Sequence, residues 1–174
     1  MEFIIFLSKL DKEILDLLIK ANYIIEENKI ECLLSKEIKG LHNFEENKIE
    51  SLINKEIKGL HNFKENIIVI CTENAKRKTN FRVIKNLLNK DNFKTERAIR
   101  KALRHEATHV AQKCNGNKTV GNINILENKL HQSKRRALEF STSNFCGTYA
   151  KEVEAYILED RPKKVKEILT KYCL

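Results

Sequence analysis

The sequence predicts an α+β fold that is mostly helical, with a small sheet. Apolar residues recur at helical spacing in most segments, as Leu10, Ile14 and Leu17 do near the N-terminus. The run from Ile67 to Cys71 is the clearest strand, because it is short, apolar and rich in β-branched residues. A length of 174 residues and a hydrophobic content of 41% suit one globular domain with an added N-terminal element.

Residues 1–65 are predicted to form a helical N-terminal region. It begins with an amphipathic helix over residues 9–25. Residues 26–44 are then repeated as residues 45–63, with only three differences between the copies. Two copies are fewer than the roughly three that a solenoid needs, so the tandem duplication indicates an insertion.

Each 19-residue copy is predicted to form a short helix followed by a turn. The helical spacing in the copies stops at Gly40 and Gly59, and glycine is favoured just beyond a helix end. His42 and His61 follow these glycines, so we expect both side chains to be exposed in turns.

Residues 66–174 are predicted to form the main domain. Its longest helix should begin at Thr95, a favoured N-cap residue, and end at Asn115-Gly116. Pro162 should open a terminal helix, because proline is favoured in the first helical turn. The remaining patterns predict helices over 79–90, 126–139 and 148–160, with a second short strand near 120–125.

The charge, the hydropathy and the cysteine spacing of the chain limit the classes of partner and cellular location that we expect. The net charge of +9 comes from scattered lysines without interleaved aromatic residues, so no specific nucleic-acid partner is expected. The apolar run Phe3–Leu7 is too short for a signal peptide, and no window approaches the roughly 20 apolar residues of a membrane span. We therefore expect an intracellular, cytoplasmic protein. Its five cysteines should be reduced by default, with a Cys71–Cys114 disulfide as the open alternative.

The segment His105-Glu106-Ala107-Thr108-His109 predicts a zinc site within the long helix. Histidines four residues apart lie on one helix face, with Cβ atoms about 5–6 Å apart, so their imidazoles can share one tetrahedral ion. Glu106 lies beside the first ligand and can act as the general base toward a zinc-activated water. The alternative is an amphipathic helix with two surface histidines.

A catalytic zinc needs a third protein ligand and an open fourth position. Glu152 is the favoured third ligand, because it shares an otherwise apolar helix face and needs a partner there. Glu154 is the alternative ligand, and both glutamates could instead pair with nearby lysines. His131 also competes, but its polar neighbours favour a surface position.

These stretches resemble the glutamate-ligated zincins, metallopeptidases in which a His-Glu-x-x-His helix is followed by a helix that supplies a glutamate. The likeness is to small families such as the mitochondrial ATP-synthase-assembly peptidase and to phage and bacterial proteins of similar size. It covers residues 66–160 and is carried by Ile68–Cys71, by His105 to Cys114, and by Glu152-Val153-Glu154-Ala155.

The resemblance implies a minimal zincin-like domain that binds one Zn²⁺ per chain through His105, His109 and Glu152 and hydrolyses peptide bonds in a protein or peptide substrate. It also implies that Ile67–Cys71 is the edge strand along which the substrate lies. Many such peptidases have an acidic residue four positions after the ligand glutamate, where this chain has Tyr156.

Two side chains are candidates for stabilising the transition state, Tyr149 and Tyr156. A rival hypothesis is a regulatory or interaction module that binds zinc but catalyses weakly. A second rival is a basic nucleic-acid-associated protein with a fortuitous motif. The first rival predicts bound zinc, and the second does not.

Overall fold

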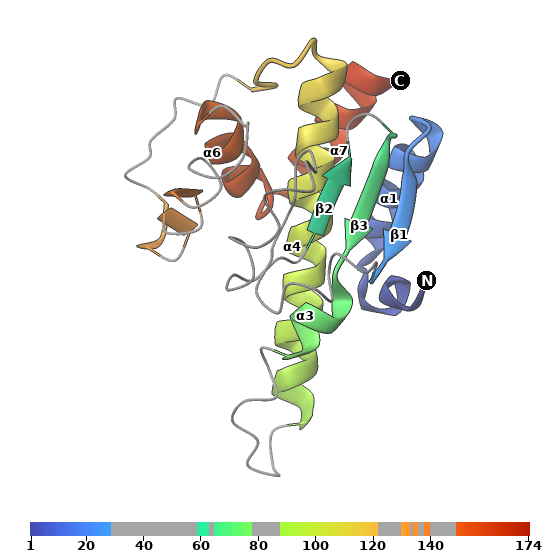
Figure 1. The fold of residues 1–174 in the computed structure, drawn as a ribbon, viewed down its shortest axis with the longest axis vertical. Helices are drawn as coiled ribbons and strands as arrows, with labels where there is room; N and C mark the ends of the chain where they lie inside the picture. Colours follow the sequence, from blue (N-terminus) through green and yellow to red (C-terminus); the bar gives the residue numbers. More distant parts are fainter. Residues whose placement is uncertain are drawn as a thin grey trace, which may run out of the picture.

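A computed structural model describes eight parts of the chain, residues 1–28, 59–62, 65–77, 88–121, 130–132, 134–135, 138–139 and 149–174. The fold is α+β and mostly helical, as predicted (Figure 1). In chain order the elements are the 3-10 helix η1 (Glu2–Phe6), α1 (Lys9–Lys20), β1 (Ile24–Glu27), β2 (Gly59–Asn62), β3 (Ile67–Ile70), α3 (Thr72–Arg77), α4 (Leu88–Cys114), α6 (Tyr149–Leu158) and α7 (Pro162–Cys173).

The sheet has the strand order β1-β3-β2, so the predicted strand β3 is central. β1 pairs with β3 in parallel, with Ile25 opposite Ile68, and β2 pairs with β3 antiparallel, with Leu60 opposite Val69. Ile68, Val69 and Ile70 are all buried, as expected of a strand with neighbours on both sides. The expectation that Ile67–Cys71 is an edge strand is therefore wrong, and β1 and β2 are the outer strands of this sheet.

The N-terminal helix ends earlier than predicted. Ser8 and Asp11 form a capping box at the start of α1, and the helix ends at Lys20. Asn22 then adopts a left-handed conformation, with φ of 62°, and the Tyr23 N–H donates to the Leu18 carbonyl, 3.0 Å away. The chain turns there into β1, so residues 24–27 are a strand and not a helical extension.

The end of the second 19-residue copy is also a strand. Residues Gly59–Asn62 form β2, where a turn was predicted, so the expected position of His61 in a turn is wrong. Gly59 is a residue type favoured just beyond a helix end, but the local sequence does not show that this segment pairs with β3. His42 and the predicted helices of both copies lie outside the described residues, as do 79–87, 122–129 and 140–148.

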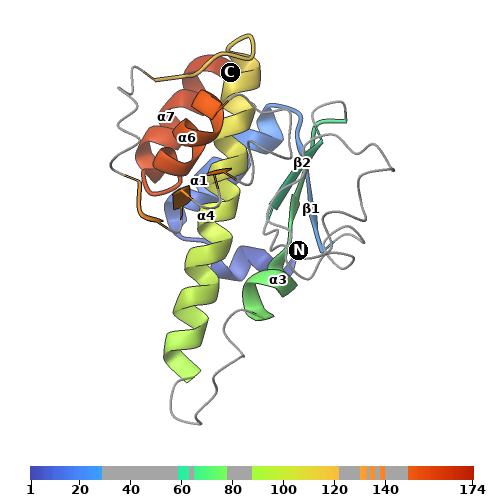
Figure 2. The ribbon, with the colours of Figure 1, turned by 60° about the vertical axis from the view of Figure 1, so that its left-hand side comes forward.

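The long helix α4 lies between the sheet on one side and α6 on the other (Figures 1 and 2). It begins at Leu88, earlier than predicted, so Thr95 is a buried residue inside the helix and not its N-cap. α7 packs along both α4 and α1. This arrangement places the C-terminal half of α4, with the His-Glu-x-x-His segment, against α6.

One hydrophobic core joins the predicted N-terminal region to the predicted main domain. It contains Phe3 and Leu18 together with Ile70, Leu103 and Leu169, all at most 2% exposed. The 65/66 boundary therefore does not separate two cores among the described residues. No helix in these residues is long and apolar enough to cross a membrane.

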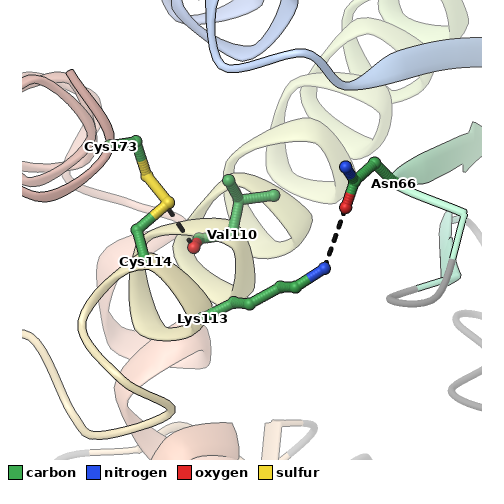
Figure 3. Close-up of a disulfide and its surroundings, with 5 residues drawn as sticks. All are labelled: Asn66, Val110, Lys113, Cys114 and Cys173. Atoms are coloured by element: carbon green, nitrogen blue, oxygen red, sulfur yellow. Dashed lines mark hydrogen bonds between the residues drawn. A yellow bond between two sulfur atoms is a disulfide. The ribbon is translucent and has the colours of Figure 1, made fainter.

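A disulfide joins Cys114, at the end of α4, to Cys173, at the end of α7 (Figure 3). Cys71 is disulfide-bonded as well. The expectation of reduced thiols is therefore wrong, and so is the Cys71–Cys114 alternative. The pairing depends on the ends of α4 and α7 lying side by side, which is a tertiary feature that cysteine spacing does not reveal.

Removing this cross-link should destabilise the fold considerably. The two cysteines are 59 residues apart in sequence. Closing a loop of that length lowers the entropy of the unfolded chain by an amount worth about 4 kcal/mol. We expect Cys114→Ser/Cys173→Ser to lower the free energy of unfolding by up to that value, measured by urea denaturation. Equal unfolding free energies for the variant and the parent would contradict this prediction.

Candidate metal centre

His105 and His109 lie one turn apart on the α6-facing side of α4. The helix is held in place beside them by Arg104, whose Nε and Nη2 donate to the two carboxylate oxygens of Asp11 at 2.6 and 2.9 Å. Asp11 is fully buried and comes from α1. A two-bond contact between arginine and carboxylate is geometrically specific, so it fixes the rotation of α4 at this point.

Glu152, in the first turn of α6, meets the two histidines. Its Oε1 lies 3.3 Å from His109 Nε2, and its Oε2 lies 3.5 Å from His105 Nε2. The two Nε2 atoms are 3.1 Å apart. Among the described residues, His105, His109 and Glu152 form a group that could hold a metal ion. The three predicted ligands thus come together from two helices.

The two histidines are spaced for a tetrahedral ion. Bonds of 2.0–2.1 Å at tetrahedral angles place ligand atoms about 3.3 Å apart, and the two Nε2 atoms are 3.1 Å apart. Glu152 faces the two rings with different oxygens, and one ligand atom from each of the three residues lies within 4.8 Å of the other two. Two imidazoles and one carboxylate are also the donor set of catalytic zinc sites. The residues present therefore fit zinc in the type of their donor atoms and in their approximate spacing.

Gln112 determines which nitrogen of His109 faces the other ligands. Its Oε1 lies 2.8 Å from His109 Nδ1, and its Nε2 donates to Glu154 and to the Lys151 carbonyl. Because both of those partners are acceptors, the amide nitrogen must face them and the amide oxygen must accept from Nδ1. In the neutral ring, His109 Nε2 then carries a lone pair toward Glu152 and His105.

Two carboxylates act on His105, one through each ring nitrogen. Glu152 lies at Nε2, and Glu159 Oε2 lies 3.8 Å from Nδ1. Burial lowers the pKa of His105, but hydrogen bonds to Glu152 and Glu159 outweigh burial and raise the pKa to about 10. When no metal is bound, His105 therefore keeps its proton at neutral pH. The positive charge of its ring then balances the negative charge of Glu152.

The carboxylates keep their charge despite burial. Burial raises the pKa of Glu152, but the facing His109 and His105 hold it well below its ordinary value. Burial likewise raises the pKa of Glu159, but His105 and Lys134 outweigh it and lower the pKa to about 2. Lys101 and Lys134 also contact Glu159, at 3.2 and 2.9 Å. Glu152 and Glu159 therefore stay ionised in the ion pairs that border the site.

Glu106 lies on α4 next to His105 and is 4% exposed. Burial raises its pKa above the ordinary value, and the charge of Glu152 adds to this effect, while His105 and His109 lower it. Those interactions place Glu106 within electrostatic reach of the whole triad. A buried carboxylate with a raised pKa has the properties expected of a general base near neutral pH.

The other predicted site residues do not belong to the group of potential metal ligands among the described residues. Glu154 is 1% exposed but faces away from the triad, accepting from Gln112 and from the backbone N–H groups of Val120 and Gly121. His131 is exposed and does not belong to the triad.

The Tyr156 ring lies edge-on against His105, with ring centroids 4.6 Å apart, whereas Tyr149 is 41% exposed. The stabilising role of these tyrosines stays a prediction.

Gln112 and Glu159 were missed by the sequence analysis. Gln112 follows His109 by three residues on the same helix face, and Glu159 follows Glu152 by seven. Helical periodicity could have found both, because residues three and seven positions apart share a face. Glu159 supplies an acidic contact to His105 in this chain, although Tyr156 stands at the position where many of the resembled peptidases have an acidic residue.

Comparison with known proteins identifies a family without a known function. DUF8637, described as a domain of unknown function, matches residues 3–50 and 42–174. The two matches overlap over residues 42–50, inside the duplicated region. No curated protein and no solved structure matches the chain. The matches span nearly the whole sequence, so the chain belongs to the DUF8637 family.

Proposed function

We propose that this protein is a zinc-dependent metallopeptidase that hydrolyses peptide bonds in a protein or peptide substrate. The observation that carries the proposal is the triad of His105, His109 and Glu152, which offers two imidazole nitrogens and a carboxylate oxygen within 4.8 Å of one another. Three protein ligands leave the fourth position open, which is characteristic of catalytic rather than structural zinc sites.

The chain's own residues divide the work of hydrolysis. Zinc, when bound, would lower the pKa of water to about 7 and polarise the substrate carbonyl. Glu106 accepts the proton of the attacking water on a carboxylate oxygen and passes it to the leaving amine nitrogen. The ligand carboxylate of Glu152 and the proton acceptor Glu106 come from different helices, so one can ligate while the other stays free to accept a proton.

Zinc titration tests the metal centre directly. The full-length chain, stripped with a chelator, should remain folded and bind about one Zn²⁺, and Co²⁺ should give the absorption bands of a tetrahedral site. A folded chain that binds neither ion would overturn the proposal. Zinc binding with no zinc-dependent cleavage of a fluorescence-quenched peptide library would overturn the peptidase activity and favour a binding module.

A further inference from the structure

A residue with no role in the proposed mechanism makes a 2.8 Å polar contact to a predicted ligand, His109. Gln112 is 1% exposed and bridges α4 to α6, because its Nε2 donates to the Lys151 carbonyl at 3.0 Å and to Glu154 Oε2 at 2.9 Å. These two bonds use both N–H donors of the amide. If the amide flipped, its oxygen would face the Lys151 carbonyl and Glu154, which are both acceptors.

Glu154 anchors this amide to the backbone beyond α4. Its carboxylate accepts the N–H of Val120 at 2.9 Å and the N–H of Gly121 at 2.9 Å. The Val120 carbonyl in turn accepts from the Tyr172 hydroxyl of α7 at 3.3 Å. Glu154 is therefore buried with its acceptor sites occupied, which explains its burial without any metal contact.

We propose that Gln112 is a positioning residue for the metal centre, and that Glu154 holds Gln112 in place. Gln112 keeps the proton of His109 on Nδ1, so that Nε2 presents a lone pair to the ion, and it fixes the rotation of the ring. This inference rests on the proposed metal centre. Partners of this kind commonly change metal affinity by about 10- to 100-fold.

Substitution of Gln112 by an apolar residue of similar size tests the inference. Gln112→Leu removes the acceptor for Nδ1, so the neutral imidazole can carry its proton on Nε2, the nitrogen that must ligate. We expect Zn²⁺ affinity to fall about 10- to 100-fold in competition with a chromophoric chelator. The matched control is Gln132→Leu, the same change at an exposed position, which should leave affinity unchanged.

Nitrogen NMR of the metal-free protein gives a readout that a purely structural role would not change. With unprotonated His109, the parent should show the Nδ1–H tautomer, and Gln112→Leu should show a mixture. The parent spectrum also covers the case in which Gln112→Leu does not fold. A parent whose neutral His109 carried its proton on Nε2 would overturn the inference without any variant.

The outcomes separate this inference from the proposed function. A parent chain that binds no zinc overturns the metal centre itself. A zinc-binding parent with a folded Gln112→Leu variant of equal affinity and unchanged tautomer overturns the role of Gln112 alone. A folded Glu154→Gln variant that kept both the zinc affinity and the Nδ1–H tautomer of the parent would overturn the role assigned to Glu154.

Discussion

Glu106→Gln should abolish peptide hydrolysis while leaving zinc bound. The amide is nearly the same size as the carboxylate, so the buried position of this side chain stays filled. An amide cannot accept the proton of the attacking water, and loss of a general base costs about 10²- to 10⁴-fold in rate. The triad of ligands is unchanged, so zinc stoichiometry should remain at about one per chain.

The measurement pairs turnover of a fluorescence-quenched peptide library with metal analysis of the same samples. Glu96→Gln is the matched control, since Glu96 lies on the same helix and pairs with Arg100 at 2.9 Å, away from the triad. It should keep both zinc and activity. If Glu106→Gln cleaved peptides as fast as the parent, Glu106 would not be the base.

The pH dependence of turnover gives the same assignment a second test. Burial raises the pKa of Glu106 from its ordinary value, and only the ionised form can accept a proton. Activity should therefore fall as pH decreases through this pKa. Any residual activity of Glu106→Gln should lack that acidic limb, because the titrating group is gone. An unchanged limb would assign the titration to another residue.

The parts of the site that follow from local sequence were predictable. His105, Glu106 and His109 lie within five residues of one helix, so helical geometry alone places the histidines on one face. Glu152 was favoured over Glu154 because a carboxylate on an apolar helix face needs a partner. The structure places Glu152, and not Glu154, among the potential metal ligands.

The errors concern residues whose environment depends on distant segments. β2 forms because this segment pairs antiparallel with β3, although Gly59 is typical of a residue just beyond a helix end. Cys114 pairs with Cys173 because α7 returns along α4, which no cysteine spacing encodes. α4 extends back to Leu88 even though Thr95 is a favoured capping residue. Tertiary contacts override local signals at each of these positions.

Glu152→Gln should weaken zinc binding more than Glu154→Gln does. The amide is neutral and a poorer ligand than a carboxylate, so the site loses both a ligand and the charge that compensates the ion. We expect zinc affinity to fall by more than about 100-fold, beyond the usual effect of a residue that only positions a ligand. Glu154→Gln is the matched control, because it keeps all three ligands and should cost no more than about 100-fold.

The same variant makes a distinct prediction for the metal-free protein. Glu152 is the largest contributor that raises the pKa of His105 to about 10, so the parent should hold the His105 proton throughout the neutral range. Removing the carboxylate charge takes away that support, and His105 should lose its proton at a lower pH in Glu152→Gln. An NMR titration of the histidine ring protons measures both values. Zinc loss in Glu154→Gln but not in Glu152→Gln, with an unshifted His105 titration in Glu152→Gln, would reverse the ligand assignment.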